Sequence, residues 1–165
     1  MGTTRDPAAV DREENLDRAI EEAGPGLVDL LIASTKDPDA EVRGTAAYGL
    51  GEVADERAVP VLVKLVERDP DEAVVVHALK ALESYRDTRV HEVLLREAER
   101  ARETRSPRWY VAKQLGWYDS ERSVEALRIL LVDQDTLVRQ AAHESLISLR
   151  PNDRALWDRL LGEQN

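Results

Sequence analysis

The fold is decided by residues 37–51, which read DPDAEVRGTAAYGLG. The Asp-Pro-Asp start returns 32 residues later at Asp69 to Asp71, and Asp133 to Asp135 open a later unit in the same way. An aspartate ahead of a helix accepts hydrogen bonds from free backbone N–H groups, and a proline in the first turn sacrifices no internal hydrogen bond. Each of these triplets therefore predicts the start of a helix.

The stretch that begins at Val42 also returns, at Val74, Pro107 and Val138, with offsets of 32, 33 and 31 residues. Apolar residues at i, i+4 and i+8 place one apolar stripe on each of these helices, and a second helix is expected after each, at 58–66, 90–98, 123–131 and 155–161. No such pair buries its apolar face alone, so stacking must supply the core. We therefore expect one all-α domain over residues 1–165, a right-handed α-solenoid of about five antiparallel helix pairs at about 7–36, 37–69, 70–103, 104–132 and 133–162.

The composition narrows the class of protein. The chain has no Cys and no Phe, and its 33 acidic against 23 basic residues give a net charge of −10. The absence of Cys excludes disulfides and thiol chemistry. An acidic surface repels phosphate backbones and favours a basic protein partner. With no apolar run long enough for a membrane span and no secretory leader, we expect a cytoplasmic protein.

These residues match a known pattern. The DPDAEVR stretch, followed by Ala46-Ala47, Leu50-Gly51 and DERAVPVL at 55–62, closely resembles the HEAT-repeat family, in particular the short bacterial HEAT-like repeats also found in phycobilisome lyases. The resemblance covers about residues 25–149 and is strongest in 37–68 and 133–149. As evidence of fold it is specific, whereas the functions of such repeats range from scaffolds and adaptors to chromophore lyases and DNA glycosylases.

The resemblance implies an internal ladder of aspartate and arginine side chains that joins successive repeats. Its residues here are Asp37, Asp69 and Asp133, with Asp39, Asp71 and Asp135 as alternatives, and Arg43, Arg108 and Arg139. Two units depart from the pattern, because Val75 stands in the arginine slot of the unit at 70–103, and Arg102 and Thr104 stand where the next unit should have aspartate. The ladder is therefore expected to be interrupted in the middle of the chain.

Candidates for catalysis or metal binding are few. Of the three histidines, His77, His91 and His143, only His91 has a carboxylate at helical spacing, Asp87 four residues earlier. Asp87 falls just ahead of a predicted second helix, so a helix cap is favoured over a metal site that lacks further ligands. Gly-rich phosphate loops and nucleophile motifs are absent from the sequence. We predict no catalytic residue, no metal and no cofactor, and hence no enzyme.

The predicted second helix of the third unit carries mixed charge and is expected to run on to Arg105, with Glu92 and Arg96 paired along it. Four aromatic residues follow within ten positions, next to two arginines: Trp109, Tyr110, Trp117 and Tyr118, with Arg105 and Arg108. By alignment, Trp109 and Tyr110 occupy slots outside the core stripe. This set has the composition of a protein-binding hot spot, and it equally suits the filling of a wider gap between repeats.

The sequence therefore favours a non-enzymatic scaffold or adaptor that presents a rigid helical surface to a basic protein, as an adaptor, assembly factor or inhibitor. One alternative is an accessory subunit resembling the HEAT-like chromophore lyases, which would need a groove for a tetrapyrrole near Trp109, Tyr110 and a histidine. Another is nucleic-acid binding centred on Arg100, Arg102, Arg105 and Arg108, which the net charge disfavours.

Overall fold

The computed structural model describes residues 5–85, 87–100 and 107–152. Within these ranges the chain forms α-helices and one short 3-10 helix, and no strand. The elements are α1 (Pro7–Glu22), α2 (Leu27–Ser34), α3 (Ala40–Val53), η1 (Glu56–Ala58), α4 (Val59–Arg68), α5 (Glu72–Leu82), α6 (Thr88–Glu99), α7 (Arg108–Leu115), α8 (Glu121–Leu130) and α9 (Thr136–Leu149). The predicted all-α class is confirmed.

The aspartates of the repeated triplets start the helices as predicted. Asp39 accepts hydrogen bonds from the first backbone N–H groups of α3, Asp71 from those of α5 and Asp135 from that of Leu137 in α9. Asp87 caps α6 in the same way, which confirms its expected role as a helix cap. Local capping chemistry therefore sets where most of the helices begin.

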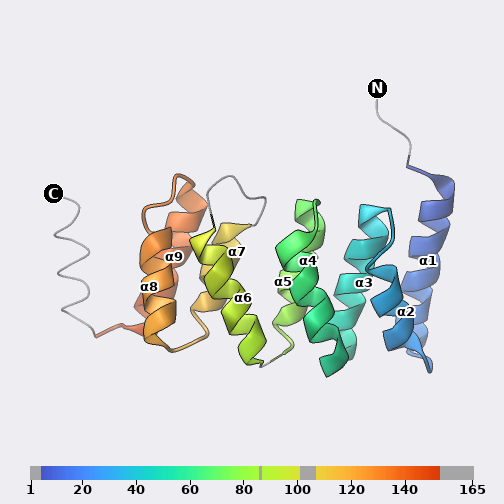
Figure 1. Ribbon diagram of the computed structural model, residues 1–165, viewed down its shortest axis with the longest axis horizontal. Coiled ribbons are helices and arrows are strands. Elements are labelled where there is room, and N and C mark those ends of the chain that lie inside the picture. The colour runs from blue at the N-terminus through green and yellow to red at the C-terminus, as the bar shows by residue number, and fades with distance from the viewer. Residues whose placement is uncertain (1–4, 86, 101–106, 153–165) are drawn as a thin grey trace.

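The helices stack in two layers along one axis (Figure 1), with α1 at one end and α9 at the other. The odd-numbered helices form one layer, in which α3 packs closely on α1 and α5, and α7 on α9. The even-numbered helices form the second layer, where α6 contacts both α4 and α8. One continuous cluster of buried apolar side chains runs between the layers from Leu16 to Leu146. The protein is thus an α-solenoid of stacked helix pairs.

Helix α3 approaches α5 closely because its residues are small. Ala46 and Ala47 are fully buried, and a Cβ added to Gly51 would lie 2.8 Å from Cα of Ala81. This backbone contact explains why glycine stands at position 51, where any side chain would push α5 away.

Four helix pairs lie within the residue ranges predicted for the first four repeats, and α9 lies within the fifth. The predicted partner of α9, at 155–161, lies outside the described residues, and the single domain stays a prediction. One boundary was wrong: α6 ends at Glu99, because Arg100 is extended, and the remainder of the expected extension, residues 101–105, lies outside the described residues. Glu92 and Arg96 also pair with neighbouring helices instead of with each other, through Arg122 and Glu67.

Candidate interaction surface

Ion pairs join successive repeats on either side of the middle of the chain. Arg43 donates from Nε and Nη2 to both carboxylate oxygens of Asp69, each at 2.8 Å, and Nε of Arg108 donates to Oδ2 of Asp133 at 2.9 Å. Arg139 instead donates to the backbone carbonyl oxygens of Asp133 and Gln134. Each ladder aspartate also accepts from the backbone N–H two residues on, so it fixes its own turn as well as the neighbouring repeat.

A further pair extends the ladder to α1. Arg12 donates to both carboxylate oxygens of Asp37, at 2.8 and 3.0 Å, and this hydrogen bonding lowers the pKa of Asp37. Sequence reasoning missed Arg12, although it precedes Arg43 by 31 residues, close to the repeat spacing.

The two halves of the ladder are separated at the junction between α5 and α7. Val75 of α5 cannot form an ion pair, and α5 makes few contacts with α7, in contrast to the close packing of α3 on α5. Two side chains of α7 span this junction: Tyr110 donates its hydroxyl hydrogen to Glu83, and Gln114 Nε2 donates to the carbonyl oxygen of Leu79 at 2.6 Å. Polar bridges thus replace part of the apolar contact.

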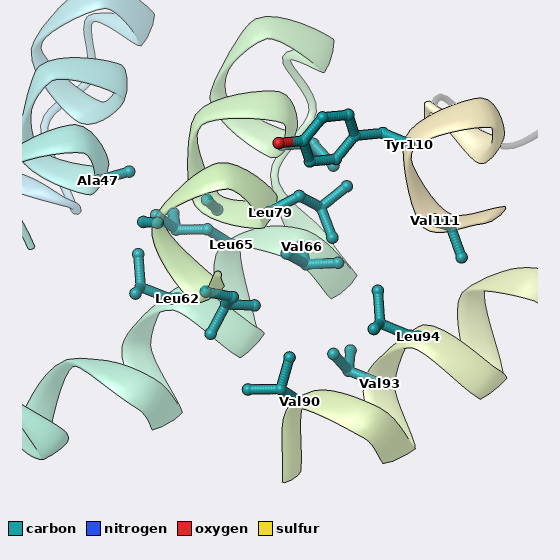
Figure 2. Packing of buried hydrophobic residues seen from close by; sticks show 14 of the residues in the cluster. Ala47, Leu62, Leu65, Val66, Leu79, Val90, Val93, Leu94, Tyr110 and Val111 are labelled. Carbon is teal, nitrogen blue, oxygen red and sulfur yellow. The ribbon is translucent and has the colours of Figure 1, made fainter. Parts of the chain in front are cut away.

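The alignment placed Tyr110 outside the core stripe, and this was wrong. Its side chain is only 5% exposed and reaches from α7 toward α5 beside Leu79 (Figure 2). Burial, together with the neighbouring Glu83 carboxylate, raises its pKa, so the phenol stays neutral and continues to donate. The ring fills the wider space between repeats, which was the second of the two sequence interpretations.

Behind this bridge lies a cleft of about 320 Å³, here named the junction cleft. It is lined by the end of α5, the start of α6 and the end of α7: Leu82, Glu83, Tyr85, Asp87, Thr88, His91, Gln114, Trp117 and Tyr118. His91 stacks on Tyr118 with ring centroids 4.6 Å apart, while Trp117 is 55% exposed at the edge. The cleft therefore combines aromatic rings with carboxylates.

His91 lies in a chain of hydroxyl groups. Its Nε2 is 2.8 Å from Oγ of Ser123, which in turn is 2.9 Å from Oγ of Ser120, the N-cap of α8. Ser123 is fully buried, so its hydroxyl is closed to a substrate, whereas Ser120 is partly exposed and its Oγ lies 3.5 Å from Nε2 of His91. Burial lowers the pKa of His91; Glu92 opposes the shift and Arg122 adds to it.

This lowered pKa predicts a pH dependence of stability. Because the unfolded chain takes up the proton first, stability is full above the unfolded pKa of about 6.5 and is lost as pH falls from there toward the folded pKa. We expect wild type to lose more unfolding free energy than His91→Gln between pH 7.5 and 5.5, measured by urea denaturation. Equal losses in wild type and His91→Gln would contradict the assignment.

A second hollow of about 340 Å³, here named the α7–α9 groove, lies on the outward side of these two helices. It is lined by Trp109, Lys113, Leu137, Gln140, Ala141, Glu144 and Ser145. Trp109 is 37% exposed and Leu137 is 61% exposed, although both are large apolar residues. The groove shares no lining residue with the junction cleft, so Trp109 and Trp117 belong to different hollows.

The predicted partner-binding set is therefore divided. Trp109 lines the α7–α9 groove, Trp117 and Tyr118 line the junction cleft, and Tyr110 is buried between them. Arg108 was expected in this set and in the ladder, and its burial against Asp133 removes it from the binding surface. Arg105 lies outside the described residues.

The basic patch considered for nucleic acid is also partly occupied. Arg100 pairs with Glu97 at 2.7 Å and donates to the carbonyl oxygen of Glu67, while Arg108 is held by Asp133. Arg102 and Arg105 lie outside the described residues. In the described part of the chain, no three histidine, aspartate or glutamate side chains gather as a metal site would need. None of the helices there has the length and apolar character to cross a membrane.

The chain is similar in sequence and in fold to known proteins. Residues 27–107 match the family model for HEAT repeats. This part of the chain belongs to the HEAT-repeat family. The chain is also similar to a solved structure titled as the complex of CpcE and CpcF of phycocyanin lyase from Nostoc sp. PCC7120, with a TM-score of 0.68 and 21% identity. The similarity covers 96% of this chain and 65% of that chain. Among curated proteins, no sequence matches this chain.

Proposed function

We propose that this protein is a non-enzymatic scaffold that binds another protein of net positive charge, as an adaptor, assembly factor or inhibitor. The observation that carries the proposal is the α7–α9 groove, where Trp109 and Leu137 stand exposed on two closely packed helices. Exposed tryptophan beside a hollow is typical of interface hot spots. Helices that are already packed lose little conformational entropy when a partner docks.

Charge supports a basic partner. The chain carries a net charge of −10, and many of its arginines are engaged in ion pairs with its own carboxylates. Exposed carboxylates on α1 are Asp11, Glu14, Asp17, Glu21 and Glu22. Such a field attracts a positively charged protein and disfavours acidic competitors.

The test is capture of partners from native lysate on the immobilised protein, followed by rebinding of each purified candidate. We expect a captured protein of positive net charge whose affinity falls at least tenfold with Trp109→Ala/Leu137→Ala, since hot-spot residues contribute about 2 kcal/mol or more. Tyr48→Ala is the matched control, because Tyr48 is 53% exposed on α3 and lies outside the groove. Rebinding that survives the double substitution, or only acidic partners, would overturn the proposal.

A second candidate is an accessory subunit of an enzyme complex. It rests on the similarity of fold to a chain from the CpcE and CpcF complex and on the aromatic lining of the junction cleft. Co-expression with a tetrapyrrole distinguishes the two: visible absorbance that copurifies and is lost in Trp117→Ala supports the accessory subunit, and colourless protein supports the scaffold.

A further inference from the structure

The junction cleft has a chemistry that the scaffold proposal leaves unused. Its walls come from α5, α6 and α7 at the place where the arginine and aspartate ladder is interrupted. The described residues that line it include two carboxylates, Glu83 and Asp87. None of these described lining residues is a lysine or an arginine. The cleft therefore offers negative charge without a cation from its described lining.

The two carboxylates are not equally available. Asp87 caps α6 and pairs with Arg89, so most of its hydrogen-bonding capacity is used. Glu83 is exposed and accepts one hydrogen bond, from the neutral phenol of Tyr110, through Oε1. A neutral donor leaves the negative charge of Glu83 in place, so Glu83 is the group that an incoming cation would meet.

The aromatic lining favours the same kind of ligand. Trp117 is exposed at the edge of the cleft, and the faces of indole and phenol rings attract cations. His91 adds no positive charge at pH 7, because burial lowers its pKa. Rings and carboxylate together point to a cationic group that can stack and form hydrogen bonds at once.

Arginine fits this combination better than lysine. The planar guanidinium stacks on aromatic faces and donates paired hydrogen bonds to a carboxylate, whereas the ammonium group of lysine is a strongly hydrated point charge. A volume of about 320 Å³ is near the lower end for ligand sites, which suits one side chain and excludes a folded element.

We propose that the junction cleft receives a single arginine side chain from an extended basic segment of the partner protein, stacked on Trp117 and paired with Glu83. This inference rests on the proposed scaffold function and adds to it the residue type that is recognised. The α7–α9 groove supplies apolar contact area, and the junction cleft supplies selection for arginine.

The probe is a capped peptide of glycine and serine with one central arginine. Two control peptides carry lysine or citrulline, the neutral isostere of arginine, at the same position. Each is titrated to millimolar concentration into the full chain while the indole N–H signal of Trp117 is followed by NMR. We expect saturable shifts with the arginine peptide, about tenfold weaker binding with lysine, and none with citrulline.

Substitutions assign the contacts. Glu83→Gln keeps an oxygen that accepts from Tyr110 while removing the charge, and it should weaken binding of the arginine peptide about tenfold. Trp117→Ala, followed by calorimetry, should abolish the binding. The matched controls are Glu52→Gln and Tyr48→Ala, an exposed carboxylate and an exposed aromatic residue of α3, which should bind as wild type.

Three results would overturn the inference. These are the absence of a saturable shift with the arginine peptide, binding of the citrulline peptide as tight as that of the arginine peptide, and binding that occurs only in the Arg86→Gln variant. The last result would mean that the chain's own arginine between Tyr85 and Asp87 occupies the cleft. The outcome for the scaffold proposal can be distinguished from the outcome for the arginine site. Partner capture that depends on Trp109 without peptide binding removes only the arginine site, and peptide binding without partner capture removes only the scaffold role.

Discussion

Replacing Asp133 with alanine should lower the free energy of unfolding by about 3–5 kcal/mol, the largest effect that we expect from a single substitution. The side chains of Arg108 and Asp133 are only 8% and 6% exposed, and they face each other between α7 and the start of α9. Without Asp133, the guanidinium of Arg108 stays buried and loses its carboxylate. Asp133 also holds the turn before α9 through the N–H of Asp135. Urea denaturation followed by circular dichroism measures the loss.

A double substitution separates the charge effect from simple loss of contacts. Arg108→Leu/Asp133→Leu removes both charges together, and we expect it to be at least 2 kcal/mol more stable than Asp133→Ala, since an apolar pair leaves no buried charge. A loss below about 1 kcal/mol in Asp133→Ala would show that the pair is effectively solvated.

Gly51→Val should destabilise the protein by about 3 kcal/mol, near the upper end for overpacking. The new Cβ would lie 2.8 Å from Cα of Ala81 and 3.0 Å from its Cβ. A backbone atom cannot rotate away as a flexible side chain does, so α3 and α5 must separate along their length. The thermal unfolding midpoint should fall by about 6–12 °C, because about 1 kcal/mol shifts the midpoint by roughly 2–4 °C in domains of about 150–250 residues.

Gly24→Val is the matched control for this crowding, since nothing lies within 4 Å of a Cβ at Gly24. We expect its stability to change by less than about 0.5 kcal/mol. If both glycine variants unfold at the same midpoint, the close approach of α3 to α5 does not restrict which amino acids are tolerated at position 51.

Much of the fold was predictable because its determinants are local. Asp39, Asp71 and Asp135 cap helices by chemistry that acts within three residues, and the repeat spacing then predicts which helices stack. The missing ionic contact at the α5–α7 junction was visible too, because Val75 stands where other repeats have arginine. The same spacing argument could have predicted the role of Arg12, but the first repeat departs from the pattern of the others.

The binding surface was harder to predict, because it depends on distances between helices that periodicity does not encode. The alignment placed Tyr110 in a slot outside the core stripe, yet the sparse packing between α5 and α7 draws the ring inward to Glu83. Trp109 and Trp117 are eight positions apart, and only the structure shows that they serve different hollows. The cleft itself requires residues from three helices to meet, which no single helical pattern contains.

The sparse α5–α7 junction also bears on the mechanics of the array. In a solenoid each repeat contacts only its nearest neighbours, so a sparsely packed interface is not reinforced by repeats farther away. Here α6 still contacts α8 within the even-numbered layer and α7 across the layers, while the odd-numbered layer is sparsely packed between α5 and α7. Bending at that place would change the angle between the helices before it, α1 to α5, and the helices after it, α7 to α9.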